Sequence, residues 1–175
     1  MRAVGVGDSS ALARRARAGE SDSFRELYLR YAPMVHAILI ARVARSEAED
    51  LTQEVFVSAW RGIGALESDE HVGAWIAGIA RNQANRSLAR ARPKAEPLSE
   101  EHPAPLDAGD ESGAILAAVR ALPQTYAETL TMRLVEGLSG PEIAALTGLT
   151  EGSVRVNLSR GMQLLRERLE REGIS

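Results

Sequence analysis

Apolar residues recur at intervals of three and four along most of the chain, which is the period of an amphipathic helix. Up to residue 92 they outline four helices, expected at about 10–18, 24–39, 46–60 and 73–91. Pro33 falls inside the second of these, so a kink or a break is expected there. Ser46 and Glu49 have the spacing of a capping box, which predicts that the third helix opens at Ser46.

Four more helices are expected further along, at about 114–122, 124–136, 139–147 and 150–171. Ser139 and Glu142 form a second capping box, and Gly148 suits the left-handed position that ends a helix. The last two helices, joined through this glycine, have the pattern of a helix-turn-helix. The angle between them is expected to be filled by Ile143, Leu146, Leu149, Val154 and Leu158. The apolar side of the last helix is predicted to consist of Val154, Leu158, Met162, Leu165 and Leu169.

The stretch 93–112 interrupts the helical pattern and contains four prolines, so it is interpreted as a flexible linker. Residues 10–92 and 113–171 are then two small domains, and residues 1–9 are expected to form a disordered tail. The charged residues just before the linker are basic, and those that follow inside the linker are mostly acidic. Two readings stay open: a solvated tether, or an acidic strand that occupies a basic channel or masks a basic patch.

Composition narrows the class of protein. Hydrophobic residues make up 45% of the 175 positions and aromatic residues only 4%, which favours an all-α globular fold. The absence of cysteine excludes disulfides and thiolate metal sites. No apolar run has the roughly 18 residues of a membrane span, so a cytoplasmic protein without membrane insertion is expected.

The predicted helix-turn-helix leaves one side of its second helix facing outward. Ser153, Arg155, Val156, Ser159 and Arg160 lie on or near this side. Arginine can pair with phosphate or with guanine in the major groove, and the first half of such a helix reaches base edges. A helical hairpin that packs against another element has the same pattern. The net charge of −3 does not by itself favour DNA binding.

A second group of polar residues lies on the third predicted helix, in the stretch "AEDLTQEVFVSAW". Asp50, Gln53 and Glu54 share one side of that helix, while Leu51 and Val55 share another. Phe56 and Trp60 extend the apolar side. The polar side is either a solvated face or a surface that pairs with arginines of a partner helix.

Both stretches resemble sigma-70-type RNA polymerase sigma factors, in particular the extracytoplasmic-function (ECF) group. The C-terminal match rests on "LPQTYAETL", "EGLSGPEIAALTG" and "GSVRVNLSRG". The N-terminal match rests on "DLTQEVF", similar to the family's polymerase-binding signature, and on "AWIAGIARN", similar to its promoter-melting helix. The two matches occur in the order expected for the family.

The resemblance implies a role for each group of residues. Core RNA polymerase, through the clamp helices of its β′ subunit, would bind Asp50, Gln53 and Glu54. The −10 promoter element would bind Trp75, Arg81, Asn82, Arg86 and Arg90, although Trp75 also suits the core. The −35 element would bind Ser153, Arg155, Val156, Ser159 and Arg160. The polymerase β flap, promoter DNA and an anti-sigma factor are the implied partners, and a stress-responsive gene set is the implied target.

The chain departs from the family pattern at two places. Val156 and Asn157 stand where the family more often has serine and arginine, which implies either a missing phosphate contact or a different promoter preference. The acidic loop 66–72 lacks the usual phenylalanine before Trp75, so the resemblance does not extend to base capture by this loop. Two other classes of protein are the alternatives: an enzyme, for which the sequence shows no nucleophile, cofactor or metal pattern, and a stand-alone helix-turn-helix regulator that binds duplex DNA without polymerase.

Overall fold

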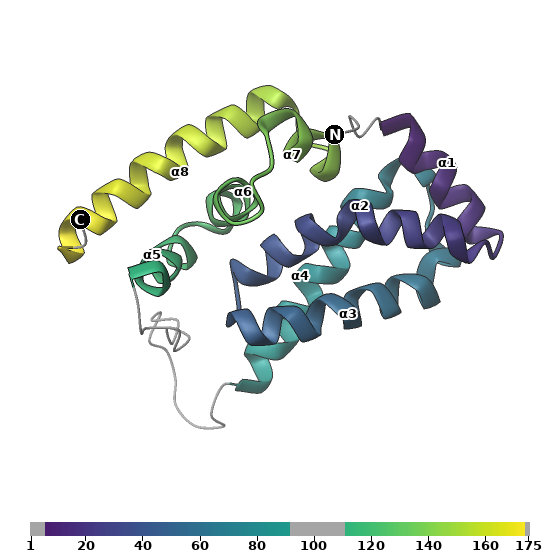
Figure 1. The fold of residues 1–175 in the computed structure, drawn as a ribbon, viewed down its shortest axis with the longest axis horizontal. Helices are drawn as coiled ribbons and strands as arrows, with labels where there is room; N and C mark the ends of the chain where they lie inside the picture. Colours follow the sequence, from purple (N-terminus) through teal and green to yellow (C-terminus); the bar gives the residue numbers. More distant parts are fainter. Residues whose placement is uncertain (1–5, 92–110, 174–175) are drawn as a thin grey trace.

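The computed structural model describes residues 6–91 and 111–173, and every regular element within these two stretches is a helix. The N-terminal unit contains α1 (Val6–Arg17), α2 (Ser21–Ile40), α3 (Arg45–Gly62) and α4 (Val72–Ala91), with short 3-10 turns at Ile63–Ala65 and Asp69–His71. The C-terminal unit contains α5 (Glu111–Arg120), α6 (Gln124–Leu134), α7 (Gly140–Thr147) and α8 (Glu151–Glu172). The all-α prediction is confirmed (Figure 1).

Two predicted boundaries differ from the structure. Helix α1 begins at Val6, inside the stretch predicted as a disordered tail, and Ser9 is buried and accepts a 2.7 Å hydrogen bond from Arg30. Helix α5 begins at Glu111, inside the predicted linker. The rest of that linker, with its prolines and most of its acids, lies outside the described residues.

Helix α2 forms the centre of the N-terminal unit, and its side chains Leu27, Met34 and Ile38 are fully buried. Pro33 lies within it without breaking it. Proline removes the hydrogen bond to the carbonyl four residues earlier, here the carbonyl of Leu29. Because Leu29 is 63% exposed, water can satisfy that carbonyl. The helix therefore continues through the proline.

The predicted capping box at Ser46 and Glu49 is wrong. Helix α3 begins at Arg45, with Ala44 as its N-cap and no side-chain capping hydrogen bond. Ser46 therefore lies inside the first turn. Glu47 of the same turn accepts a hydrogen bond from Ser87 of α4. This end of α3 therefore has a contact with another helix and no local side-chain cap.

Helix α6 connects the two units. All six residues from Ala127 to Met132 are buried, and a helix that is buried all round must be covered on more than one side. Helices α8 and α2 provide this cover (Figure 1). The hydroxyls of Thr129 and Thr131 donate to carbonyls of the preceding turn, at 2.7 and 2.8 Å, which makes their burial tolerable. Met132, Ile143 and Leu146 join the same apolar core as the N-terminal helices.

Candidate polymerase and nucleic-acid interfaces

The polar side of α3 is open to solvent. Asp50, Gln53 and Glu54 are all exposed, whereas Leu51 and Val55 face the core. The predicted separation of the two sides of this helix therefore appears in the structure. No other described segment of the chain covers the three polar side chains, so a partner can reach them without any rearrangement.

Apolar side chains border this polar surface, which the sequence reasoning missed. Trp60, expected on the apolar side, is 40% exposed and makes an edge-on contact with Phe24 at 4.9 Å between ring centroids. Val57 is 48% exposed. A groove of about 400 Å³ is lined in part by Tyr28 and Gln53. The surface thus combines acids with apolar area, as protein-binding surfaces commonly do.

The predicted −10 residues lie in different environments along α4. Asn82, Arg86 and Arg90 are exposed and, at intervals of four, occupy one side of the helix. Trp75 is half-buried and packs against the main core, lying close to Gly62. This packing agrees with a structural role for Trp75, and its contact with the −10 element stays a prediction.

The acidic loop before α4 is held in place by the first helix. Asp69 accepts from Arg17 at 3.0 Å and from Arg14 at 3.4 Å, and its side chain is only 15% exposed. Leu66 and Val72, at the two ends of the loop, are buried. One acid of this loop is therefore already neutralised within the protein, a long-range pairing that local sequence reasoning could not have identified.

The predicted caps of the helix-turn-helix are confirmed. Ser139 accepts from the Glu142 amide at 3.3 Å, and Glu142 accepts from the Ser139 amide at 2.8 Å and from its hydroxyl at 2.6 Å. These hydrogen bonds from Ser139 lower the pKa of Glu142. Gly148 adopts φ of 76°, and Thr150 accepts from the Ser153 amide at 3.1 Å. Local sequence signals thus determine both ends of the turn.

Two apolar residues of this motif are not where the pattern placed them. Ile143 and Val154 fill the angle between the helices, but Leu149 is 40% exposed. Met162 is 39% exposed, and the small Gly161 takes the buried position beside Leu130 instead. Because Leu130 lies so close to α8, the buried side of this helix contains Gly161 rather than Met162.

The predicted −35 residues all face outward. Ser153, Arg155, Val156, Ser159 and Arg160 are exposed along one side of α8. Val156 is 45% exposed, so its side chain is accessible on this side of the helix. Asn157, its neighbour in the departure from the family pattern, is partly buried.

A buried carboxylate joins the two units. Glu128 of α6 accepts from Arg42 Nη2 at 2.6 Å and from Arg81 Nη2 at 2.8 Å, and its side chain is 8% exposed. Arg81 Nε also lies 3.1 and 3.2 Å from the two carboxylate oxygens. The hydrogen bond with Glu128 raises the pKa of Arg81 above its ordinary value. Sequence reasoning singled out Arg81 but neither Arg42 nor Glu128.

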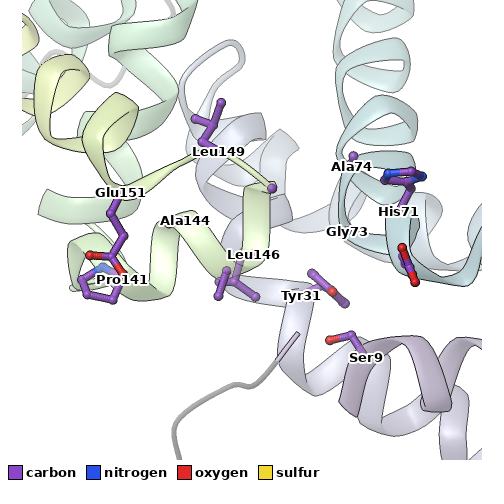
Figure 2. A pocket seen from close by; sticks show the side chains of 13 residues that line it. Ser9, Tyr31, His71, Gly73, Ala74, Pro141, Ala144, Leu146, Leu149 and Glu151 are labelled. Atoms are coloured by element: carbon purple, nitrogen blue, oxygen red, sulfur yellow. The ribbon is translucent and has the colours of Figure 1, made fainter. Parts of the chain in front are cut away.

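Further contacts hold the units together around this carboxylate. His36 Nδ1 lies 2.6 Å from Glu136 Oε1, and Arg120 Nε donates to the Ile40 carbonyl at 2.8 Å. At the start of α4, Gly73 passes so close to the helix-turn-helix that an added Cβ would lie 2.5 Å from the Leu146 carbonyl oxygen. Figure 2 shows this region, where Leu146 and the neighbouring turn face Tyr31 and the start of α4 across a cavity of about 450 Å³. Helix α4, which the resemblance assigns to the −10 element, and the helix-turn-helix, which it assigns to the −35 element, therefore lie in direct contact.

The comparisons with known proteins agree with this arrangement of helices. Residues 27–93 match the family described as Sigma-70 region 2, and residues 112–165 match Sigma-70, region 4. The RNA polymerase sigma factor CarQ of Myxococcus xanthus is 36% identical over 164 residues, covering 89% of this chain and 94% of CarQ. The ECF RNA polymerase sigma factor BldN of Streptomyces coelicolor is 35% identical over 166 residues. The chain therefore belongs to the sigma-70 family of RNA polymerase sigma factors, and within it to the extracytoplasmic-function group.

The BldN match covers 88% of this chain but only 63% of BldN, so the chain spans less than two thirds of that relative. The structure of CnrH in complex with the cytosolic domain of CnrY shares the fold, with a TM-score of 0.61 at 24% identity, covering 93% of this chain and 97% of that one.

Among the described residues, no helix has the length and apolar character to cross a membrane. No group of three or more His, Asp or Glu side chains in the described part of the chain is placed to hold a metal ion.

Proposed function

We propose that this protein binds core RNA polymerase, recognises the −10 and −35 promoter elements and starts transcription of a specific set of genes. The observation that carries the proposal is the occurrence of sigma regions 2 and 4 in order on one chain, with the polar side of α3 fully open. A stand-alone regulator has no need of such a surface. The proposed role is one of binding and positioning, and it places the protein in the cytoplasm, where polymerase and DNA are.

Polymerase binding is assigned to α3. Asp50 and Glu54 offer two carboxylates one helical turn apart, and Gln53 adds an amide between them. Arginines of the β′ clamp helices can pair with this surface, while Val57 and Trp60 add apolar area next to it. The bordering apolar groups matter because exposed ion pairs alone contribute little to affinity.

DNA binding is divided between the two units. Asn82, Arg86 and Arg90 form a basic side of α4 suited to the opened −10 strand. The exposed side of α8 is assigned to the major groove of the −35 element, where Arg155 and Arg160 can contact phosphates or guanine. Val156 is able to contact a thymine methyl group, which would give this chain a promoter preference of its own.

Partners beyond polymerase remain predictions. CnrH is held in complex with the cytosolic domain of CnrY in its solved structure. A protein that binds this chain in a similar way, an anti-sigma factor, would have to cover the α3 surface or the DNA-binding sides of α4 and α8. We also propose that the target genes respond to stress and that the protein contacts the β flap.

Charge reversal on α3 tests the proposal. In the double variant Asp50→Arg and Glu54→Arg, we expect loss of co-elution with core polymerase and of promoter-dependent transcription. The matched control is Asp22→Arg with Glu26→Arg, which reverses two exposed acids at the same spacing on α2. Circular dichroism establishes that both variants remain folded. Unchanged core affinity in the α3 variant, or equal loss in the control, would refute the assignment.

A further inference from the structure

The surroundings of Glu128 have the properties of an anion site. Its carboxylate belongs to the C-terminal unit, but the cations around it all belong to the N-terminal unit. Arg81 presents a two-pronged fork and Arg42 adds a third donor. Arg42 is oriented by a second hydrogen bond, from Nη1 to Asn85 Oδ1 at 3.2 Å. The N-terminal unit therefore positions all of these donors, through α2, the turn after it and α4. The C-terminal unit supplies only the anion.

This arrangement needs an anion whether or not the two units are together. The Arg42 side chain is only 10% exposed, and two guanidinium groups converge on one point. Two guanidinium groups held side by side disfavour each other unless a counter-charge lies between them. If Glu128 moved away with the C-terminal unit, another oxyanion would be favoured in its place.

A phosphodiester is a suitable occupant of the site as well as a carboxylate. Arginine forks match phosphate geometry and form charge-assisted hydrogen bonds with it. Arg42 Nε is buried and has no hydrogen-bond partner among the described residues, so Glu128 does not satisfy every donor. The side chain of Arg81 is 41% exposed, which leaves the site an opening on α4. The next residue, Asn82, begins the side of α4 assigned above to the −10 strand.

We propose that Arg42 and Arg81 form a phosphate-binding site for the single promoter strand, and that Glu128 occupies this site while the two units are packed together. This inference rests on the proposed function, which assigns α4 to the −10 element. It adds Arg42 to the nucleic-acid interface. It also makes separation of the units a condition for full binding of the strand.

The distance between the promoter elements requires the same separation. The −10 and −35 elements lie about 60–70 Å apart, nearly two helical turns. In the structure the start of α4 touches the helix-turn-helix at Gly73 and Leu146. The packed arrangement therefore cannot place both units on their elements at once, and release of Glu128 accompanies the change that DNA binding demands.

The test uses the full chain and a fluorescein-labelled single strand of mixed sequence, about 15 nucleotides long. Fluorescence anisotropy in low salt should show that Glu128→Gln binds the strand on the order of tenfold more tightly than the unaltered protein. One additional phosphate contact should also steepen the dependence of log affinity on log salt by about 0.7. Glu170→Gln, which changes the same charge on an exposed position of α8, should leave both values unchanged.

Arg42→Gln gives the second half of the test. Added to Glu128→Gln, it should abolish the gain in affinity and the steeper salt dependence. If the Glu128→Gln protein is partly unfolded, its thermal unfolding is measured instead of anisotropy. Inorganic phosphate should then raise its Tm more than chloride does at equal ionic strength, and Arg42→Gln should remove this effect. A Glu128→Gln protein with unchanged affinity and salt dependence, or a gain that survives Arg42→Gln, would overturn the inference.

Transcription with core polymerase separates this inference from the proposed function. Arg42→Gln should reduce open-complex formation, and Glu128→Gln should not. Normal open complexes with Arg42→Gln would sink the phosphate site while leaving the sigma function intact. Failure of the unaltered protein to open any promoter with core polymerase would instead refute the proposed function itself.

Discussion

At the scale of single residues, a few polar side chains fix the local geometry of the DNA-binding motif. Ser139 and Glu142 satisfy each other's amides at the start of α7, and Thr150 satisfies the Ser153 amide at the start of α8. Each cap needs only residues within one turn of the helix. This explains why the sequence was sufficient to predict both caps and the left-handed glycine between them.

The Ser139 cap gives a prediction about stability and its pH dependence. Ser139→Ala should lower the free energy of unfolding by about 1 kcal/mol at neutral pH, the usual cost of losing such a cap. The folded-state pKa of Glu142 is lowered by Ser139, so this contribution is present above the ordinary glutamate pKa of about 4.3 and is lost as the pH falls through the lowered value. Urea unfolding at pH 7 and in acid measures the difference, and a difference that grows in acid would contradict this account.

At the scale of elements, α4 carries two glycines in very different surroundings. On helix propensity alone both should weaken the helix by up to about 1 kcal/mol relative to alanine. Nothing lies within 4 Å of a Cβ added at Gly78. A Cβ at Gly73 would lie 2.9 Å from the Tyr31 ring and 2.5 Å from the Leu146 carbonyl oxygen. Propensity therefore decides the effect of alanine at Gly78, and steric contact decides it at Gly73.

These two positions form a matched pair. Gly78→Ala should raise the free energy of unfolding by up to about 1 kcal/mol, and Gly73→Ala should lower it, because backbone or a buried ring must move. Urea unfolding of the two variants measures both signs. A stabilised Gly73→Ala protein would show that α4 and the helix-turn-helix are not in contact in solution.

The elements also show where sequence reasoning stops. The helix-turn-helix and the order of eight helices follow from apolar periods and local caps. The start of α3 does not, because the helix begins one residue before Ser46, with Ala44 as its N-cap and no side-chain capping hydrogen bond. The exposure of Met162 and the burial of Gly161 were missed for a different reason, since the contact with Leu130 of α6 decides which residue of α8 fits. The period of the apolar residues therefore identifies the buried side of a helix only approximately where another helix lies very close.

At the scale of the whole molecule, the sequence predicted two units but not how they meet. Glu128 follows Ala127 in a stretch that the sequence predicts only as a helix, and its two arginine partners lie 47 and 86 positions away. A buried acid between distant cations has no local signature. The one available sign was the composition of α6, whose polar residues alternate with apolar ones too closely to leave a single polar side.

The central claim is that this sigma factor holds its two DNA-binding units together when free and separates them on the promoter. The chain has no cysteine, so spin labels on Ala74→Cys and Leu149→Cys report one defined distance. Both positions line the cavity between the units. Pulsed EPR should give a short distance in the free protein and a much longer one, approaching the separation of about 60–70 Å between promoter elements, in the complex with core polymerase and promoter DNA. A short distance that persists in that complex, or a long one already present in the free protein, would contradict the account.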